Sequence, residues 1–264
     1  MKRTSLWAWL WIVLGVGYFF TPLLATLLFS LRAKRNEIGL TAYASVFSDS
    51  RFFETFTFSL EMALLTIVAS LLLIVPTAYW VHMRLPRLRP VIEFITLLPF
   101  VVPAIVLVFG LIKIYSRPPL SLTSSALTTN ILLVAGYVVL ALPYMYRSVD
   151  TGLRAIDVRT LTEAAESLGA SWPTILIRVI FPNVRVALLS GAFLTFAIVI
   201  GELTLAQYLA RPAFGPYMAL IGQDRAYEPS ALAIISFALT WLSVAVIQFL
   251  GRAAPGQAQL GGTK

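Results

Sequence analysis

The sequence has no cysteine and a single histidine, and both shortages narrow the chemistry that it can perform. Without cysteine, disulfides, thiolate metal sites and thiol catalysis are excluded. A Ser/His/Asp hydrolytic site or a histidine metal cluster would have to be built around His82, which lies beside Arg84 near the end of an apolar run, where we expect an interfacial histidine. A membrane-embedded enzyme would need a cluster of His, Asp or Cys at membrane depth, and no such cluster stands out. We therefore expect no enzyme activity, metal or cofactor.

Charged residues are also scarce. They make up 12% of the chain against 59% hydrophobic residues, whereas an ordinary globular domain has roughly 25% charged residues. The mean hydropathy of +0.85 points the same way, so we predict an integral membrane protein whose surroundings are lipid. The net charge of +8 comes from Lys and Arg scattered singly between apolar runs. That distribution is typical of topology signals and not of a phosphate-binding face, so we expect no nucleic-acid partner.

Long apolar runs are what the sequence does contain. A run of ~20 residues is enough for a helix to cross ~30 Å of hydrocarbon. We predict one all-α transmembrane domain, residues 1–264, with six spans at 7–31, 58–81, 91–115, 129–146, 184–210 and 230–250. The first run is too long for the apolar part of a leader, so we expect it to be retained. Five prolines inside these runs predict bent helices or hinges: Pro22, Pro76, Pro99, Pro103 and Pro143.

The loop charges predict the orientation. With the N-terminus inside, twelve Lys and Arg lie on the cytoplasmic side and seven on the other, with Lys113 unassigned. This bias favours a multi-pass protein with both termini in the cytoplasm, although the cluster Arg32, Lys34 and Arg35 opposes it. Residues 154–183, between the fourth and fifth spans, are then cytoplasmic.

Residues 154–183 have the pattern of two short helices joined by a glycine turn. Asp157 is a good N-cap for a helix whose apolar stripe includes Val158, Leu161, Ala165 and Leu168. Gly169 follows where a left-handed residue is wanted, and Ser171 with Pro173 starts a second helix that we expect Pro182 to end.

Small side chains on the first of these helices invite a partner. Ala164 and Ala165 would let another protein approach closely. The alternative is a linker on the membrane surface that contacts no partner.

The spacing in this segment resembles a known family. Three residues separate Glu163-Ala164-Ala165 from Gly169, and nine more precede Val179-Ile180-Phe181-Pro182. This is similar to the EAA loop of binding-protein-dependent ABC importer permeases, with Val179 in place of Ile and Phe181 in place of Leu as apolar-for-apolar departures. The six-span layout also fits such type I importer permeases.

The resemblance implies partners and a role. The first short helix would be a coupling helix in a groove of a cytoplasmic ATPase, with Glu163, Ala164, Ala165, Gly169 and Pro182 as coupling residues. The importer would contain two ATPase subunits, a second permease in a heterodimer, and an external solute-binding protein at a bacterial-type inner membrane. The sequence contains no P-loop pattern, so ATP would be hydrolysed on another chain. An ATP-independent secondary carrier is the alternative, but the sequence shows no internal repeat.

Candidate substrate-path residues lie in the fifth predicted span. An acid at a span centre costs ~2.5–3.5 kcal/mol on insertion scales, so Glu202 needs a reason, and with Thr204 and Gln207 it could line the path. Bonding to a neighbouring helix or to the partner permease is the alternative. The runs GELTLAQYLARPAFGPYMALIG and TAYASVFSDSRFF resemble spermidine and putrescine permeases of the second component type. Polyamine is therefore the expected cargo, with ferric iron, thiamine, phosphonate or an oxyanion as alternatives.

Overall fold

The computed structural model describes residues 6–33 and 38–252, and these residues form helices, turns and loops. The α-helices are α1 (Leu6–Ser30), α2 (Thr41–Ser48), α3 (Ser50–Met83), α4 (Arg89–Val101), α5 (Ala104–Tyr115), α6 (Ala126–Arg154), α7 (Val158–Ser167), α8 (Trp172–Thr174), α9 (Phe181–Gly201), α10 (Thr204–Tyr208), α11 (Phe214–Asp224) and α12 (Glu228–Arg252). A 3₁₀ turn, η1 (Pro86–Leu88), precedes α4, and a π-helical stretch, η2 (Ile175–Ile180), precedes α9. Residues 1–5, 34–37 and 253–264, which carry part of the charge used to predict the orientation, lie outside the described residues.

Helix length and composition support a multi-pass membrane protein. Within the described residues, four helical segments are long and apolar enough to cross a membrane: Trp7–Ser30, Ser50–Met83, Ala126–Arg154 and Trp172–Gly201. The bent pair α4 and α5 makes a fifth if both helices belong to one span. Within the described residues, α12 contributes a shorter apolar stretch, Glu228–Leu242. The count of six spans therefore stays a prediction.

The third predicted span, residues 91–115, is not one helix. It consists of α4 and α5, which meet at a bend of 100°. Val102 has an extended ψ of 114°, and Pro103 follows it as the residue before α5. Proline has no N–H to donate and disfavours helical geometry in the residue before it, so the bend expected at Pro103 is a complete break.

The fifth predicted span, residues 184–210, is also interrupted. Helix α9 ends at Gly201, Glu202 has extended backbone angles, and the short helix α10 starts at Thr204. The apolar character of the sequence continues across this break, so hydropathy alone does not reveal it. The physical cause is the side chain of Glu202, which binds the free backbone N–H groups of the next helix.

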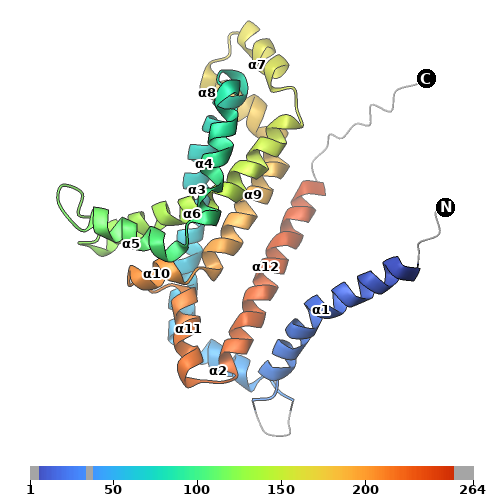
Figure 1. The fold of residues 1–264 in the computed structure, drawn as a ribbon, viewed down its shortest axis with the longest axis vertical. Coiled ribbons are helices and arrows are strands. Elements are labelled where there is room, and N and C mark those ends of the chain that lie inside the picture. Colours follow the sequence, from blue (N-terminus) through green and yellow to red (C-terminus); the bar gives the residue numbers. More distant parts are fainter. Residues whose placement is uncertain (1–5, 34–37, 253–264) are drawn as a thin grey trace.

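The core of the bundle is formed by α3, α6 and α9, which all contact one another. Figure 1 shows α7 and α8 at one end of this bundle and α2 and α11 at the other, with α1 diverging from it. Helix α1 packs against α12, and the apolar window of α1 is not buried in this chain. One buried apolar cluster, which includes Val149, Leu153 and Ile175, supports the end that carries α7. The bundle therefore holds the predicted coupling segment on a packed base.

Candidate functional site

The first short helix of the 154–183 segment begins as the sequence predicts. Asp157 is the N-cap of α7, and its carboxylate accepts hydrogen bonds from the Thr160 backbone N–H at 3.1 Å and from the Thr160 hydroxyl at 2.7 Å. Both hydrogen bonds lower the pKa of Asp157, and the bond from the Thr160 hydroxyl has the larger effect. The cap thus satisfies a backbone donor that the start of a helix leaves free.

The glycine turn after α7 is also as predicted. Gly169 has a φ of +77°, in the left-handed region. Its N–H donates to the Glu166 carbonyl at 2.9 Å, and the Ala170 N–H donates to the Ala165 carbonyl at 3.0 Å. This pair of bonds is the Schellman arrangement, which satisfies the last carbonyls of a helix and reverses the chain.

One face of α7 is attached to the bundle. Val158 is buried, and the Thr162 hydroxyl hydrogen-bonds the Tyr79 hydroxyl of α3 at 3.1 Å in a buried contact. Leu161 and Ala165 pack against the same apolar cluster. The predicted apolar stripe therefore faces inward, apart from Leu168, which is 89% exposed.

The other face of α7 is open. Glu163 and Ala164 are exposed, and Glu163 accepts a hydrogen bond from Arg159 at 2.7 Å, which raises the pKa of Arg159. Beside them is a groove of about 700 Å³ lined by residues of α3, α7 and α8, among them Trp80, Glu166 and Trp172. Arg84 and Arg159 also line this groove, so basic, acidic and aromatic side chains all face it.

Pro182 does not end the second short helix, contrary to the prediction. The chain runs helically from Trp172 to Gly201, with Pro182 in the first turn of α9. The preceding π-helical stretch has wider turns, in which the Phe181 N–H donates to the Leu176 carbonyl. Local π-helical turns let a continuous membrane helix accommodate a proline, because they re-satisfy backbone groups that the proline leaves without a partner. The coupling segment is therefore continuous with the membrane helix α9.

A cluster of charged residues that the sequence analysis did not single out lies just before α7. Asp150 of α6 is buried, and its two carboxylate oxygens bind three basic side chains from the ends of different helices. His82 Nε2 of α3 and Arg89 Nη2 of α4 both lie 2.8 Å from Oδ1, and Arg154 Nη2 of α6 lies 2.6 Å from Oδ2. His82 is therefore a partly buried member of an ionic cluster and not a simple interfacial histidine.

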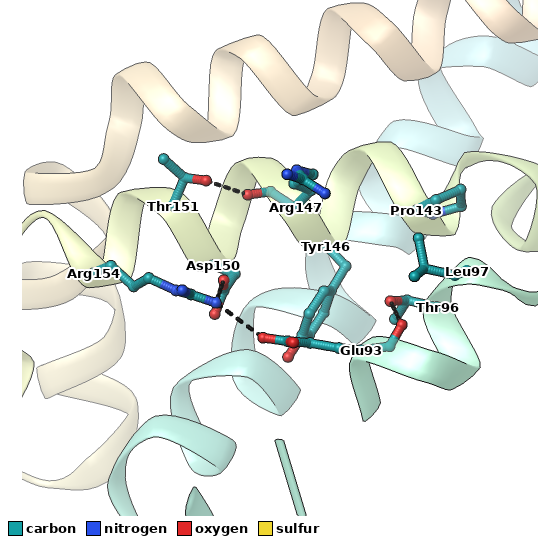
Figure 2. Close-up of a pocket in the computed structure, with 9 residues that line it drawn as sticks. All are labelled: Glu93, Thr96, Leu97, Pro143, Tyr146, Arg147, Asp150, Thr151 and Arg154. Carbon is teal, nitrogen blue, oxygen red and sulfur yellow. Dashed lines mark hydrogen bonds and ion pairs between the residues drawn. The ribbon is translucent and has the colours of Figure 1, made fainter. Parts of the chain in front are cut away.

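Glu93 completes this cluster, which we call the Asp150 hub (His82, Arg89, Glu93, Asp150 and Arg154). Glu93 Oε1 accepts from Arg89 at 3.1 Å and from Arg154 at 2.9 Å. Figure 2 shows Arg154 reaching from α6 towards Glu93 on α4, beside a pocket of about 260 Å³. Arg89 and Glu93 are four residues apart, and so are Asp150 and Arg154, a spacing that favours ion pairs on one helix. No spacing in the sequence connects these two pairs to each other or to His82.

Glu202 lies between α9 and α10, and backbone N–H groups bind its carboxylate. Its carboxylate accepts from the Leu205 N–H at 2.9 and 3.0 Å and from the Ala206 N–H at 3.3 Å. The buried Tyr137 of α6 is a further hydrogen-bond neighbour. Glu202 is 9% exposed, and its side chain satisfies free N–H groups at the start of α10, whose N-cap residue is Leu203.

The other two predicted path residues are on α10. Thr204 is half-buried and Gln207 is exposed, so Gln207 is the more accessible of the two. Gly215 of α11 lies against this segment so closely that an added Cβ would clash with the Glu202 carbonyl oxygen. The three residues are thus neighbours in the chain, but the structure gives them different surroundings.

Most of this chain, including the capped segment, matches a known protein family. Residues 74–253 match the family described as the binding-protein-dependent transport system inner membrane component. The chain belongs to this family of ABC importer permeases. A member of the family is a membrane transport subunit that works in an assembly with an ATPase and a binding protein.

Relatives of this chain are named for different cargoes. A probable molybdenum ABC transporter permease protein of Haloferax volcanii is 32% identical over 77% of this chain and 73% of its own length. The spermidine/putrescine permease protein PotB of Escherichia coli is 30% identical over 55% of this chain and 57% of PotB. PotC of the same organism is 23% identical over 89% of this chain and 90% of PotC. The chain thus matches little more than half the length of PotB.

Solved structures show the same fold. A bacterial ABC transporter involved in the import of alginate has a TM-score of 0.70 and 14% identity, with 93% of each chain covered. An amino acid ABC transporter has a TM-score of 0.55 and 18% identity, covering 80% of this chain and 97% of the other. The all-helical fold of this chain is therefore that of an ABC importer permease.

Proposed function

We propose that this chain forms half of a heterodimeric permease in an importer driven by two ATPase subunits, with both of its termini in the cytoplasm. A separate binding protein delivers the solute from outside. The observation that carries this proposal is the geometry of α7: one face is bound to α3 and the bundle, and the other exposes Glu163 and Ala164 beside a groove. A helix held in this way can receive force on its open face and pass it to the bundle.

The continuity between η2 and α9 supports the same role. A displacement of α7 acts on α6 through residues 155–157 and on α9 through the unbroken helix from Trp172 to Gly201. These two helices pack against each other in the centre of the bundle. Motion at α7 therefore reaches the membrane region along two covalent connections.

For the cargo, we propose a polyamine. PotB and PotC are named for spermidine and putrescine, and α3 offers acids that suit a cation. Glu54 and Glu61 are exposed and seven residues apart, which places them on one side of α3 about two turns apart. Glu61 lies within the predicted span, where a carboxylate needs a water-filled path or a partner. Glu202 adds less to this argument because backbone N–H groups occupy its carboxylate.

An oxyanion is the second candidate, because the Haloferax volcanii relative is named for molybdenum. Ferric iron, thiamine and phosphonate have no comparable support among the relatives described above. An oxyanion would be recognised by cations and N–H groups, whereas an ammonium needs carboxylates. The two cargoes therefore predict opposite effects of removing acids from α3.

Uptake by the purified transporter tests the proposal. The complex is isolated through a tag on this chain, reconstituted with its binding protein, and supplied with radiolabelled putrescine, spermidine or molybdate with and without ATP. We expect ATP-dependent uptake of the polyamines, with an increased KM in Glu61→Gln and no change in the exposed control Asp224→Asn. Uptake of molybdate alone would contradict the polyamine assignment, and ATP-independent uptake would contradict the role as an ABC permease.

A further inference from the structure

The Asp150 hub joins three helix ends at one buried carboxylate. Asp150 and Arg154 are in the last turns of α6, His82 is at the end of α3, and Arg89 with Glu93 is at the start of α4. Each basic side chain in contact with Asp150 lies 2.6 to 2.8 Å from it. Asp150 is the buried member of the hub, whereas the side chains of Glu93 and Arg154 are partly exposed. Losing its arginine partners would leave the Asp150 carboxylate buried and unpaired, which is unfavourable.

The hub is next to the segment that moves in the proposed function. Only three residues separate Arg154 of the hub from Val158, the first residue of α7. On the other side, Tyr79 and Trp80, in the turn of α3 before His82, contact Thr162 of α7 and Trp172 of α8. A shift of α7 therefore acts on both α6 and α3 at the point where the hub binds them to each other.

The hub also extends this connection to α4, which has no contact of comparable strength with α7. Helix α4 leads through the bend at Pro103 to α5, and Phe109 of α5 packs on Tyr208 of α10 at 4.9 Å between ring centroids. Helix α10 carries Thr204 and Gln207. The sequence of contacts thus runs from α7 through the hub and α4 to the helix that holds the candidate path residues.

We propose that Asp150 is a positioning residue that binds the ends of α3, α4 and α6 into one unit, so that these helices move together when the ATPase displaces α7. This inference rests on the proposed function, because it assigns a way in which the same coupling site transmits force. Asp150 touches neither solute nor nucleotide in this role. Its removal should lower the amount of solute transported per ATP and leave hydrolysis itself in place.

The experiment measures uptake and ATP hydrolysis in the same reconstituted complex. In Asp150→Ala, we expect the ratio of solute to ATP to fall by a factor of roughly 2 to 30, the range seen when residues between two coupled sites are changed. Asp150→Asn keeps the shape of the side chain and one acceptor oxygen. Its ratio of solute to ATP should therefore lie between those of the wild type and Asp150→Ala. The control Asp224→Asn is an exposed aspartate at the end of α11 and should match the wild type.

A covalent link provides a test that a purely structural role would not pass. The chain has no cysteine, so His82→Cys combined with Asp150→Cys introduces the only two thiols. We expect this double variant to be uncoupled, and a short thiol-to-thiol crosslinker to restore the ratio by joining α3 to α6. A linked protein that stays as uncoupled as the unlinked one would overturn the proposal.

The remaining outcomes are distinct. If the wild type shows no ATP-dependent uptake, the proposed function fails and not the hub. If the wild type is coupled and Asp150→Ala matches Asp224→Asn, the hub has no positioning role. If neither Asp150→Ala nor Asp150→Asn purifies with the ATPase, Asp150 is required for assembly, and the inference is wrong.

Discussion

Gly169 shows how a single residue can be essential through its backbone. Its φ of +77° suits glycine, while no atom lies within 4 Å of where a Cβ would be. The strain in a substituted protein would therefore come from the backbone alone, at about 1–2 kcal/mol for an ordinary residue in the left-handed region and more for a β-branched one.

Gly169→Val should therefore destabilise the turn after α7 and uncouple ATP hydrolysis from uptake, with the protein still inserted in the membrane. Gly169→Asn is the matched control, because asparagine tolerates left-handed geometry. We expect it to keep most of the uptake per ATP hydrolysed. Equal activity of the valine variant and the wild type would show that this turn does not position α7.

Asp157 predicts a dependence of stability on pH. Its pKa is lowered by the Thr160 hydroxyl and backbone N–H, so the charged cap stabilises the folded protein above the unfolded pKa of about 3.9 and loses this effect as the pH falls through the lower folded pKa. The melting temperature of the wild type should exceed that of Asp157→Ala fully at neutral pH and by less below about pH 4. Asparagine caps a helix without a charge. The difference in melting temperature between Asp157→Asn and Asp157→Ala should therefore stay constant over this pH interval.

Local chemistry explains which residues could be predicted. Asp157 and Gly169 act through backbone groups a few residues away, so their roles can be read from spacing in the sequence. Asp150 acts through His82, Arg89 and Arg154, two of which come from other helices. Such a cluster is defined by tertiary packing, and the sequence alone does not bring its members together.

The close contact between α11 and the break between α9 and α10 leads to a prediction about stability. Gly215 of α11 lies against the backbone of Glu202, where an added Cβ would clash with the carbonyl oxygen. Gly215→Ala must displace a backbone segment and should lower stability by about 1–3 kcal/mol, the usual cost of overpacking. Gly222→Ala on the same helix has its nearest atom at 3.7 Å and should be nearly neutral in a thermal unfolding assay.

The helices differ in how far the sequence predicted them. The bend at Pro103 was expected because proline itself disrupts a helix, although its size of 100° depends on packing. The break at Glu202 was missed, because an acid followed by an apolar run looks like a continuous span until its carboxylate is seen to bind the N–H of Leu205. The sequence also did not reveal that the helix continues through Pro182, because a proline usually ends a helix. The π-helical turns that accommodate it become visible only in the structure.

The whole chain was predicted most reliably from composition. An all-helical membrane protein follows from long apolar runs with few charges, and the family match over residues 74–253 confirms the class that the EAA spacing indicated. The orientation and the count of six spans remain predictions, since they depend on the bilayer and on the assembled importer. Residues 154–183 must face the cytoplasm if α7 is to meet an ATPase.

The central claim is that the open face of α7 contacts the ATPase, and site-directed crosslinking in the cysteine-free chain tests it most directly. Ala164→Cys on α7 is compared with Ala44→Cys, an exposed alanine of α2 at the opposite end of the molecule (Figure 1). We predict that a thiol crosslinker joins the Cys substituted at Ala164 to the ATPase, and that an impermeant thiol reagent reaches this site only from the cytoplasmic side. The Cys substituted at Ala44 should form no crosslink to the ATPase, and the impermeant reagent should label it only from outside. Labelling of the Ala164 site from outside, or its failure to crosslink in an active complex, would contradict the account.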